Sequence, residues 1–389
     1  QKLFLRNNIL TTFMKKSFLM TIVKKRFLNF LLRINALPIV KKMSIFMKNT
    51  KNTTLSSIKY SVLDLVPIVE GITAKEAITR SLDLAQHAEQ FGYHRFWISE
   101  HHNMESLASA SPVILINHVA QGTERIRVGS GGVMLPNHAP LVVAEQFGTL
   151  ATIHPNRIDL GLGRAPGTDQ RTAMALRRYQ QETVQDFPNN INELQMYLSE
   201  ENSTEAVRAT PGEGLDIPLY LLGSSTFSAQ LAGKKGLPYA FASHFAPTHL
   251  HDALRLYHQN FQPSAQLDKP YTMACLNIIA ADTDEEAEFL STSAKKFMLG
   301  VIRNTRKPLP PPVQSMDGEW STMERMQIEK MMYYSFIGSK ETIAEGLKTF
   351  VEETQVNEII VIANIYDQEA RLKSYKLVSE VFDAIEVPV

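Results

Sequence analysis

From residue 58 onward, apolar and polar positions follow a pattern that repeats along the chain. A short run dominated by apolar residues, 60–66, is typical of a strand. The capping box Thr73-x-x-Glu76 follows it and opens a stretch with apolar residues at helical spacing. Gly92 then stands where a glycine commonly ends a helix. The pattern therefore predicts a repeating unit of a strand, a turn and an amphipathic helix.

The number of repeats predicts the fold class. Strands are predicted at 60–66, 95–98, 126–134, 158–162, 219–222, 239–242, 273–280 and 358–363. Helical stretches separate them, for example from Pro140 to about Ile153. Alternating β and α units imply a parallel sheet, and eight of them favour an α/β fold closed into a (β/α)₈ TIM barrel. An open doubly wound sheet is the alternative, although no G-x-G-x-x-G opens a helix after a strand.

Two connections are longer than a barrel needs, and we interpret them as insertions in the βα loops. One covers about 172–216 and is polar, and the other, 303–320, is rich in proline. Long loops in compact domains are commonly lids or binding loops. We therefore expect both segments to contact the substrate and the second to cover the barrel mouth.

The charge of the chain is divided unevenly, although its formal net charge is zero. The 13 basic residues up to Lys59 all precede the first acid, Asp64, so the rest of the chain carries a net charge of −13. An acidic body disfavours nucleic acid as a partner, because phosphate binding needs a basic stripe. The single cysteine, Cys275, excludes an internal disulfide and fits a reducing cytoplasm.

Residues 1–57 differ from the rest, because they are basic and contain no acid. Their apolar runs are interrupted by basic residues and are shorter than the ~18–20 residues that a membrane span needs. We interpret 1–57 as a basic extension, either a disordered tail or a stretch upstream of a start at Met43 or Met47. A transit peptide or a surface-lying amphipathic segment is the alternative. Residues 58–389 are expected to form the barrel.

Three titratable residues, Glu100, His101 and His102, follow the second predicted strand. In a barrel the chemistry lies at the carboxyl ends of the strands. Adjacent residues of an extended segment point to opposite faces, so the two histidines cannot easily bind one metal, and no H-x-H follows a strand. One imidazole facing the mouth would suit proton transfer. The alternatives are a structural histidine and a glutamate that caps a helix or bonds a neighbour.

Glycines and phosphate-binding side chains follow the next strands. Gly131 and Gly132 lie within an apolar strand, where they clear space for a flat ring or serve barrel packing. The hydroxyls after the fifth strand and an arginine after the fourth form a plausible phosphate clamp, although a lone serine is more commonly a helix N-cap. The members of this clamp are Arg164, Ser224, Ser225 and Ser228. Together these features predict a phosphorylated, flat cofactor.

These residues lie in stretches that resemble the bacterial luciferase-like flavin-dependent monooxygenase family, in particular its uncharacterised single-subunit members. The matching stretches are 96–102, 128–136, 143–150, 157–167 and 222–228. They occur in order, and the resemblance covers about 59–389. It implies a barrel that binds FMN, supplied in reduced form by a separate flavin reductase, and a homodimer. The implied activity is a two-component monooxygenation by O₂ of an aldehyde or another small organic substrate.

The resemblance also assigns roles to single residues. It implies that His101 assists the flavin hydroperoxide stage and that Glu100 lies near the ring, and we take both as catalytic. Gly131-Gly132 matches a position beside the isoalloxazine that is often a non-prolyl cis peptide. Three residues of the clamp, Arg164, Ser225 and Ser228, match phosphate contacts, with Ser224 adjacent.

The sequence departs from the light-emitting members at two places. Those members carry a reactive cysteine where this chain has Gly163, and an acidic residue near Ser224. The departures speak against light emission but not against flavin binding. Two alternatives stay open: a deazaflavin-dependent hydride-transfer oxidoreductase of the same fold, and a barrel that binds flavin without turnover. The histidine spacing disfavours metal-dependent hydrolysis.

Overall fold

The computed structural model describes residues 58–165, 168–177, 186–305 and 307–384. The basic extension predicted at 1–57 lies outside the described residues.

Ten strands form one sheet in which all pairings are parallel. The sheet closes because the last strand, β10 (Glu358–Ile362), pairs with both β1 (Lys59–Asp64) and β8 (Thr272–Ala280). The remaining strands are β2 (Arg95–Ile98), β3 (Arg127–Ser130), β4 (Val133–Met134), β5 (Ile158–Gly163), β6 (Leu219–Gly223), β7 (Tyr239–Phe241) and β9 (Ser335–Gly338). The eight predicted strands all lie in the closed barrel, so the predicted fold class is confirmed.

The structure differs from the predicted strands in two places. The stretch predicted as one strand at 126–134 is divided into β3 and β4, because its pairing is interrupted at Gly131-Gly132. The short β9 was not predicted, and it pairs with the second half of β8, at Asn277 to Ala280. Only four residues long, β9 has too little sequence to show a strand period of its own.

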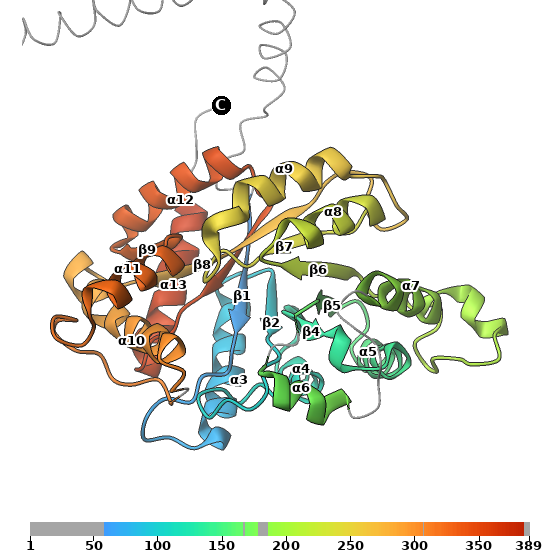
Figure 1. Cartoon of the computed structure of the whole chain (residues 1–389), viewed down its shortest axis with the longest axis horizontal. Coiled ribbons are helices and arrows are strands. Elements are labelled where there is room, and N and C mark those ends of the chain that lie inside the picture. The colour runs from blue at the N-terminus through green and yellow to red at the C-terminus, as the bar shows by residue number, and fades with distance from the viewer. Residues whose placement is uncertain (1–57, 166–167, 178–185, 306, 385–389) are drawn as a thin grey trace, which may run out of the picture. The chain divides into compact units, whose positions relative to one another are not determined.

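Helices surround the barrel (Figure 1). They are α3 (Ala74–Gln90), α4 (Pro112–Gln121), α5 (Pro140–Ile153), α6 (Gln170–Arg177), α7 (Phe187–Leu198), α8 (Thr226–Lys235), α9 (Leu250–Asn260), α10 (Asp284–Ile302), α11 (Thr322–Met331), α12 (Lys340–Thr354) and α13 (Gln368–Ala384). Short 3₁₀ turns are η2 (Leu135–Asn137), η4 (Glu200–Thr204) and η5 (Pro247–His249). The capping box of Thr73 and Glu76 forms as predicted, and α3 ends just before Gly92, whose φ is +81°.

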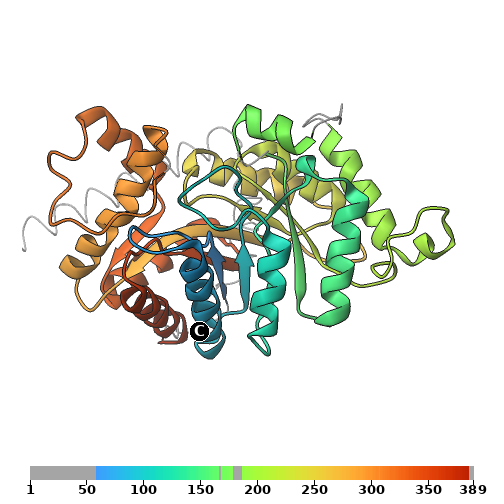
Figure 2. The ribbon, with the colours of Figure 1, turned by 90° about the horizontal axis from the view of Figure 1, so that it is seen from below.

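Apolar side chains fill two layers. The larger layer lies between the strands and the helices that pack on them. Figure 2 shows these helices and strands from below. A smaller cluster fills the inside of the barrel and includes Leu63, Trp97, Tyr220, Cys275 and Ile360. Parallel strands are buried on both faces, which explains why they appear in the sequence as nearly continuous apolar runs.

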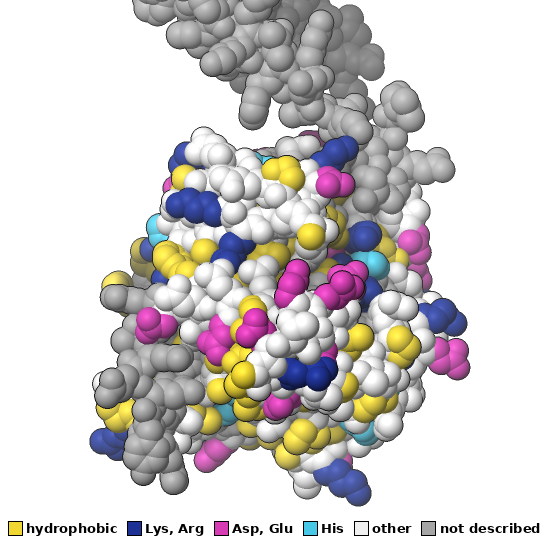
Figure 3. Space-filling model, turned by 90° about the vertical axis from the view of Figure 1, so that its right-hand side faces the viewer, with side chains coloured by type: hydrophobic (Ala, Val, Ile, Leu, Met, Phe, Trp, Pro, Cys, Tyr) yellow, Lys and Arg dark blue, Asp and Glu magenta, His cyan; other side chains and the backbone are white. Residues whose placement is uncertain are grey.

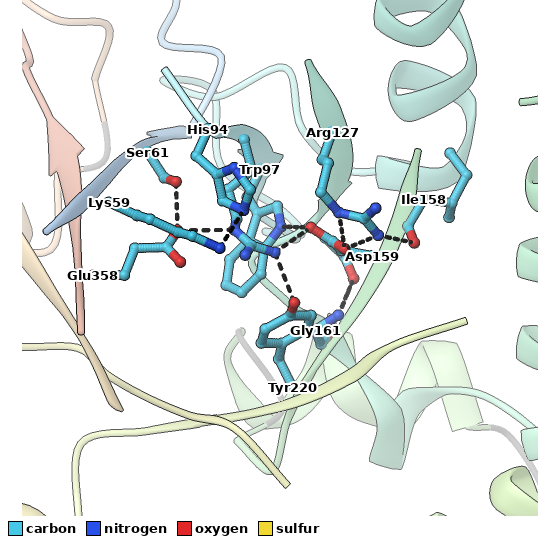
Figure 4. Close-up of polar contacts among 12 residues, drawn as sticks. Lys59, Ser61, His94, Trp97, Arg127, Ile158, Asp159, Gly161, Tyr220 and Glu358 are labelled. Carbon is cyan, nitrogen blue, oxygen red and sulfur yellow. Dashed lines mark hydrogen bonds and ion pairs between the residues drawn. The ribbon is translucent and has the colours of Figure 1, made fainter. Parts of the chain in front are cut away.

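A buried polar network lies inside the barrel near the amino-terminal ends of the strands (Figure 4). The Arg95 guanidinium, 3 % exposed, lies 2.6 Å from Asp159 Oδ2 and 2.8 Å from Glu358 Oε1. Burial alone would lower the pKa of Arg95, but the two carboxylates outweigh it and raise that pKa. Trp97 donates its indole N–H to Asp159 Oδ2 at 3.1 Å. The network thus connects three strands across the barrel and supports Trp97.

Two properties of the surface bear on partners. On the face in Figure 3, lysines and arginines are interspersed with aspartates and glutamates. Among the described residues, no helix is long and apolar enough to cross a membrane.

Candidate active site

A cavity of about 450 Å³ opens at the carboxyl ends of the barrel strands. Its floor contains Leu63 and Trp97 of the inner apolar cluster. Segments following β2, β5, β6 and β7 form much of its wall, and α10 and α11 contribute Phe297, Met298, Val301 and Met331. Cofactor sites are commonly concave, largely apolar and of this size, with a few polar groups that fix orientation. The position agrees with the expectation that the chemistry lies at this end of the barrel.

His101 lines this cavity directly after β2. Its Nδ1 lies 3.0 Å from the Ser99 hydroxyl, and its backbone N–H donates to Ser109 O at 3.3 Å. Burial lowers the pKa of His101 to about 4, which outweighs the opposing effect of Glu100. The imidazole is therefore neutral at physiological pH, with one N–H and one lone pair.

Glu100 does not line the cavity, although its neighbours in the chain, Ser99 and His101, do. Its fully buried carboxylate accepts hydrogen bonds from Met134 N at 3.0 Å and from the Nε2 atoms of His102 and His138, each at 2.8 Å. Burial alone would raise the pKa of Glu100, but the histidine and backbone hydrogen bonds outweigh it and lower that pKa. The carboxylate thus fixes β4, which follows Gly131-Gly132 directly in the chain.

The cluster of Glu100, His102 and His138 also has the composition of a metal site, because one ligand atom from each lies within 4.8 Å of the others. Both histidine nitrogens, however, are at hydrogen-bond distance from the same carboxylate oxygen, Glu100 Oε1. The arrangement is that of a hydrogen-bonded triad whose centre is an acceptor oxygen rather than a vacant coordination site. His138 comes from the loop before α5, and nothing in the local sequence pattern pointed to it.

Gly131 and Gly132 both line the cavity, and the peptide bond between them is cis, as the resemblance predicted. A Cβ on Gly132 would lie 2.7 Å from Gly161 O, and one on Gly131 would lie 2.7 Å from Leu63 Cδ1. Barrel packing by itself therefore requires a glycine at 132, where the Cβ would meet backbone, whereas at 131 the nearest atom is the end of the Leu63 side chain, which can rotate away. Their absent side chains also leave a flat stretch of backbone facing the cavity.

The predicted phosphate clamp is brought together on the same cavity. Its four members, Arg164, Ser224, Ser225 and Ser228, all line the wall. Ser225 occupies the N-cap position of α8, but its hydroxyl makes no capping hydrogen bond. Among the described residues no carboxylate pairs with Arg164, whose Cζ lies 4.1 Å above the Phe227 ring. A guanidinium without a counter-ion beside the amino-terminal end of a helix is a ready anion site.

Two lining residues of the cavity were not predicted from the sequence, and two segments that were expected to contact the substrate do not line it in their described parts. His244, which follows β7, and Asn277 of β8 line the cavity, yet an isolated histidine or asparagine gives no local signal. The segments 172–216 and 303–320 contribute no described residue to the lining, contrary to our expectation. Instead, 303–320 borders a neighbouring cleft, and its Leu309 pairs with the backbone at Ile68 and Glu70. The helices α10 and α11 line the cavity in their place.

Comparison with known proteins decides the family. Residues 58–358 match the family model described as luciferase-like monooxygenase, which spans more than half of the chain. The chain belongs to the luciferase-like monooxygenase family. The resemblance to this family that the sequence motifs predicted is confirmed.

The matches between this luciferase-like chain and its named relatives cover nearly the whole length of each relative. It is 51 % identical to a luciferase-like monooxygenase of Escherichia coli K12 over 84 % of this chain and 98 % of the relative. It is 32 % identical to the N-acetyl-S-alkylcysteine monooxygenase of Bacillus subtilis over 83 % of this chain and 98 % of that enzyme.

Solved structures agree with the fold. The crystal structure of apo-MsnO8 superposes with a TM-score of 0.79 at 33 % identity, covering 84 % of this chain and 99 % of that one. The oxygenating constituent of 3,6-diketocamphane monooxygenase from Pseudomonas putida, in complex with FMN, gives a TM-score of 0.64 at 18 % identity. The match covers 85 % of this luciferase-like chain and all of that protein, and it shows the shared fold.

Proposed function

We propose that this protein is a two-component monooxygenase that binds reduced FMN in the cavity and uses O₂ on an aldehyde or another small organic substrate. The observation that carries the proposal is the content of one cavity: a neutral, buried His101, and the guanidinium of Arg164, which no carboxylate of the described residues pairs with. Membership of a monooxygenase family and an FMN-bound structural neighbour support the choice of cofactor.

The phosphate of FMN would be held by the clamp at the amino-terminal end of α8. Arg164 would supply charge and up to two parallel N–H bonds, and Ser225 has a hydroxyl that no capping bond occupies. Ser224 lies next to it, and Ser228 is buried at the same wall. The backbone N–H groups of the first turn of α8 would complete the site.

The ring of the flavin would lie in the part of the cavity between the clamp and His101. The flat backbone at Gly131-Gly132 and the apolar side chains around it suit a planar aromatic system. Glu100 is a positioning residue in this account, because it holds Met134 N on the strand directly after the two glycines. We therefore move Glu100 from the catalytic role expected from sequence to a supporting one.

His101 would donate or accept the proton that moves during the reaction. Reduced FMN, when bound, supplies the reaction with O₂ and the transfer of one oxygen atom to the substrate. Because Ser99 engages Nδ1, the other nitrogen, Nε2, is left for the cavity. A neutral imidazole can there donate or accept one proton without carrying a buried charge.

The protein also has to keep water from the reacting groups. Phe297, Met298 and Val301 of α10 and Met331 of α11 place apolar side chains on the cavity. An apolar cover strengthens the polar interactions inside and suppresses side reactions of reduced flavin with solvent. On the family resemblance, we propose that a separate flavin reductase supplies FMNH₂ in the cytoplasm and that the active protein is a homodimer.

The proposal is tested by mixing the protein with reduced FMN and aerated buffer in a stopped-flow instrument. We expect the bound flavin to be reoxidised more slowly than free flavin, with a transient absorbance that neither free form shows. His101→Ala should change that time course, whereas His118→Ala, at an exposed position on α4, should not. Reoxidation at the free-flavin rate in all three proteins would contradict the proposal. Tight FMN binding with unaltered oxygen reactivity would indicate a flavin carrier, and selective binding of a deazaflavin would indicate a hydride-transfer enzyme.

A further inference from the structure

A second histidine, His244, lies on the cavity wall and has no role in the flavin site described above. It follows β7, and two hydrogen bonds to β8 fix its segment: Asn277 Nδ2 donates to His244 O at 2.6 Å, and the Ser243 hydroxyl donates to Cys275 O at 2.6 Å. The backbone at this position is therefore held, and the imidazole is presented to the cavity.

The imidazole of His244 has no hydrogen-bond partner among the described residues. Its Nδ1 is buried, and a buried polar atom without a partner normally destabilises a protein by about 1–3 kcal/mol. Because Nδ1 itself is inaccessible, the ring nitrogen that a ligand in the cavity can reach is Nε2, which is not among the buried atoms and has no hydrogen-bond partner among the described residues either. Buried polar groups that the fold leaves unsatisfied are rare and are found preferentially at functional sites. The burial of His244 lowers its pKa to about 3, with a smaller effect from His101 in the same direction. The ring is therefore a neutral donor and acceptor.

The surroundings of His244 define the chemistry of the ligand. The side chains that share its part of the lining are apolar or uncharged, among them Phe245, Cys275, Asn277 and Met298. Burial raises the pKa of Cys275, so its thiol is uncharged as well. In the whole described lining the only fully charged side chain is Arg164, which the phosphate clamp uses. A buried ionic substrate would thus lack a counter-ion, which disfavours it strongly.

We propose that His244 donates a hydrogen bond to the carbonyl oxygen of an uncharged, otherwise apolar substrate that lies in the cavity between His244 and His101. The inference rests on the proposed function, and it adds the residue that recognises the substrate and the class of substrate it recognises. It distinguishes a ketone or aldehyde, which accepts one hydrogen bond, from a carboxylate, which brings a charge that the wall does not neutralise.

The test uses two probes of equal length, 2-octanone and octanoate, whose binding to the full chain is measured by calorimetry with and without FMN. We expect 2-octanone to bind at least about tenfold more tightly than octanoate. His244→Leu should weaken 2-octanone binding by about tenfold, whereas His244→Gln, which keeps an N–H donor, should retain most of it. The matched control is His249→Gln, at an exposed position on the same loop, which should bind 2-octanone like the wild type.

Thermal unfolding and FMN binding separate the possible outcomes. Because His244→Leu removes an unpartnered buried nitrogen, its melting temperature should equal or exceed that of the wild type. Equal binding of octanoate, no binding of 2-octanone at millimolar concentration, or unchanged 2-octanone binding by His244→Leu would overturn the inference. So would a large fall in melting temperature in both variants, which would assign His244 a structural role. A protein that binds 2-octanone as expected but does not bind FMN would refute the proposed function and leave the role of His244 standing.

Discussion

The Ser99 hydroxyl lies 3.0 Å from Nδ1 of His101, and this contact fixes which nitrogen of the imidazole can serve the cavity. Ser99 itself is buried, and its hydroxyl lies 3.3 Å from that of Ser109. The loop that carries Ser109 also accepts the backbone N–H of His101. Two serines thus orient a histidine that has no other described side-chain partner, in the way that a second polar group orients a catalytic imidazole.

Replacing Ser99 by alanine should therefore disturb the proton transfer assigned to His101 without removing the flavin site. We expect Ser99→Ala to slow the His101-dependent phase of flavin reoxidation by about tenfold, the effect of one lost hydrogen bond. The control is Ser81→Ala, since the Ser81 hydroxyl is buried on α3 without a partner. The assignment of Ser99 fails if both variants show the wild-type time course in stopped-flow absorbance.

Glu100 should prove to be a positioning residue. Glu100→Gln replaces an acceptor of three N–H bonds by a group that brings donors of its own, so at least one contact becomes unfavourable. We expect a loss of about 1–3 kcal/mol in the free energy of unfolding, measured by urea titration, with a smaller effect on FMN phosphate affinity. Glu105→Gln, at an exposed position on the following loop, is the matched control and should be neutral. Equal stability of the two variants would remove the role assigned to Glu100.

The network of Arg95 (Figure 4) should govern stability rather than chemistry, because no residue of it except Trp97 lines the cavity. Arg95→Met leaves Asp159 and Glu358 buried without their shared guanidinium. Removing one partner of such a buried network costs about 3–5 kcal/mol. Chemical denaturation should show this loss, while Arg125→Met, in a pair whose arginine is 73 % exposed, should change stability little. A small effect of Arg95→Met would mean that other groups neutralise the two acids.

The stability of the protein without flavin should fall in mild acid. Burial lowers the pKa of His94 and His101 to about 4 and that of His244 to about 3. In the unfolded chain these groups titrate near about 6.5, so between about pH 4 and 6.5 the unfolded state binds more protons than the folded one. The contribution of these histidines is therefore complete above about pH 6.5 and is lost as the pH falls toward about 4.

The corresponding measurement is the urea midpoint as a function of pH. The variant His101→Gln/His244→Gln should lose part of the slope between about pH 4 and 6.5, by up to about two protons. An identical slope in the variant and the wild type would show that neither histidine is held neutral by the fold.

The barrel could be predicted from sequence because its signals are local. Strands buried on both faces give continuous apolar runs, and the Thr73 capping box and Gly92 mark the two ends of α3. That Arg164 and the three serines lie on one cavity could be predicted for a related reason: the carboxyl ends of adjacent parallel strands meet at one end of a barrel.

Other parts of the site depend on contacts between distant segments, which leave no local pattern. His138 reaches Glu100 across 38 positions, and the backbone carbonyl of His244 is fixed by Asn277, 33 positions away. The prolines of 303–320 predict a cover there, whereas the apolar side chains of α10 and α11 line the cavity, a contact that cannot be assigned without the fold. The resemblance places Glu100 near the ring. In the structure its carboxylate does not line the cavity and accepts hydrogen bonds from Met134 N, His102 and His138, which is why we propose a positioning role for it.

The most direct test of the account compares reduced FMN with reduced riboflavin, which lacks the phosphate, as ligands of the wild type and of Arg164→Ala under anaerobic conditions. We expect the wild type to bind FMN at least about tenfold more tightly than riboflavin. The Arg164→Ala variant should lose most of this preference for FMN while its affinity for riboflavin stays nearly unchanged. Equal affinity of the wild type for the two flavins, or a preference that survives in Arg164→Ala, would contradict the placement of FMN in this cavity.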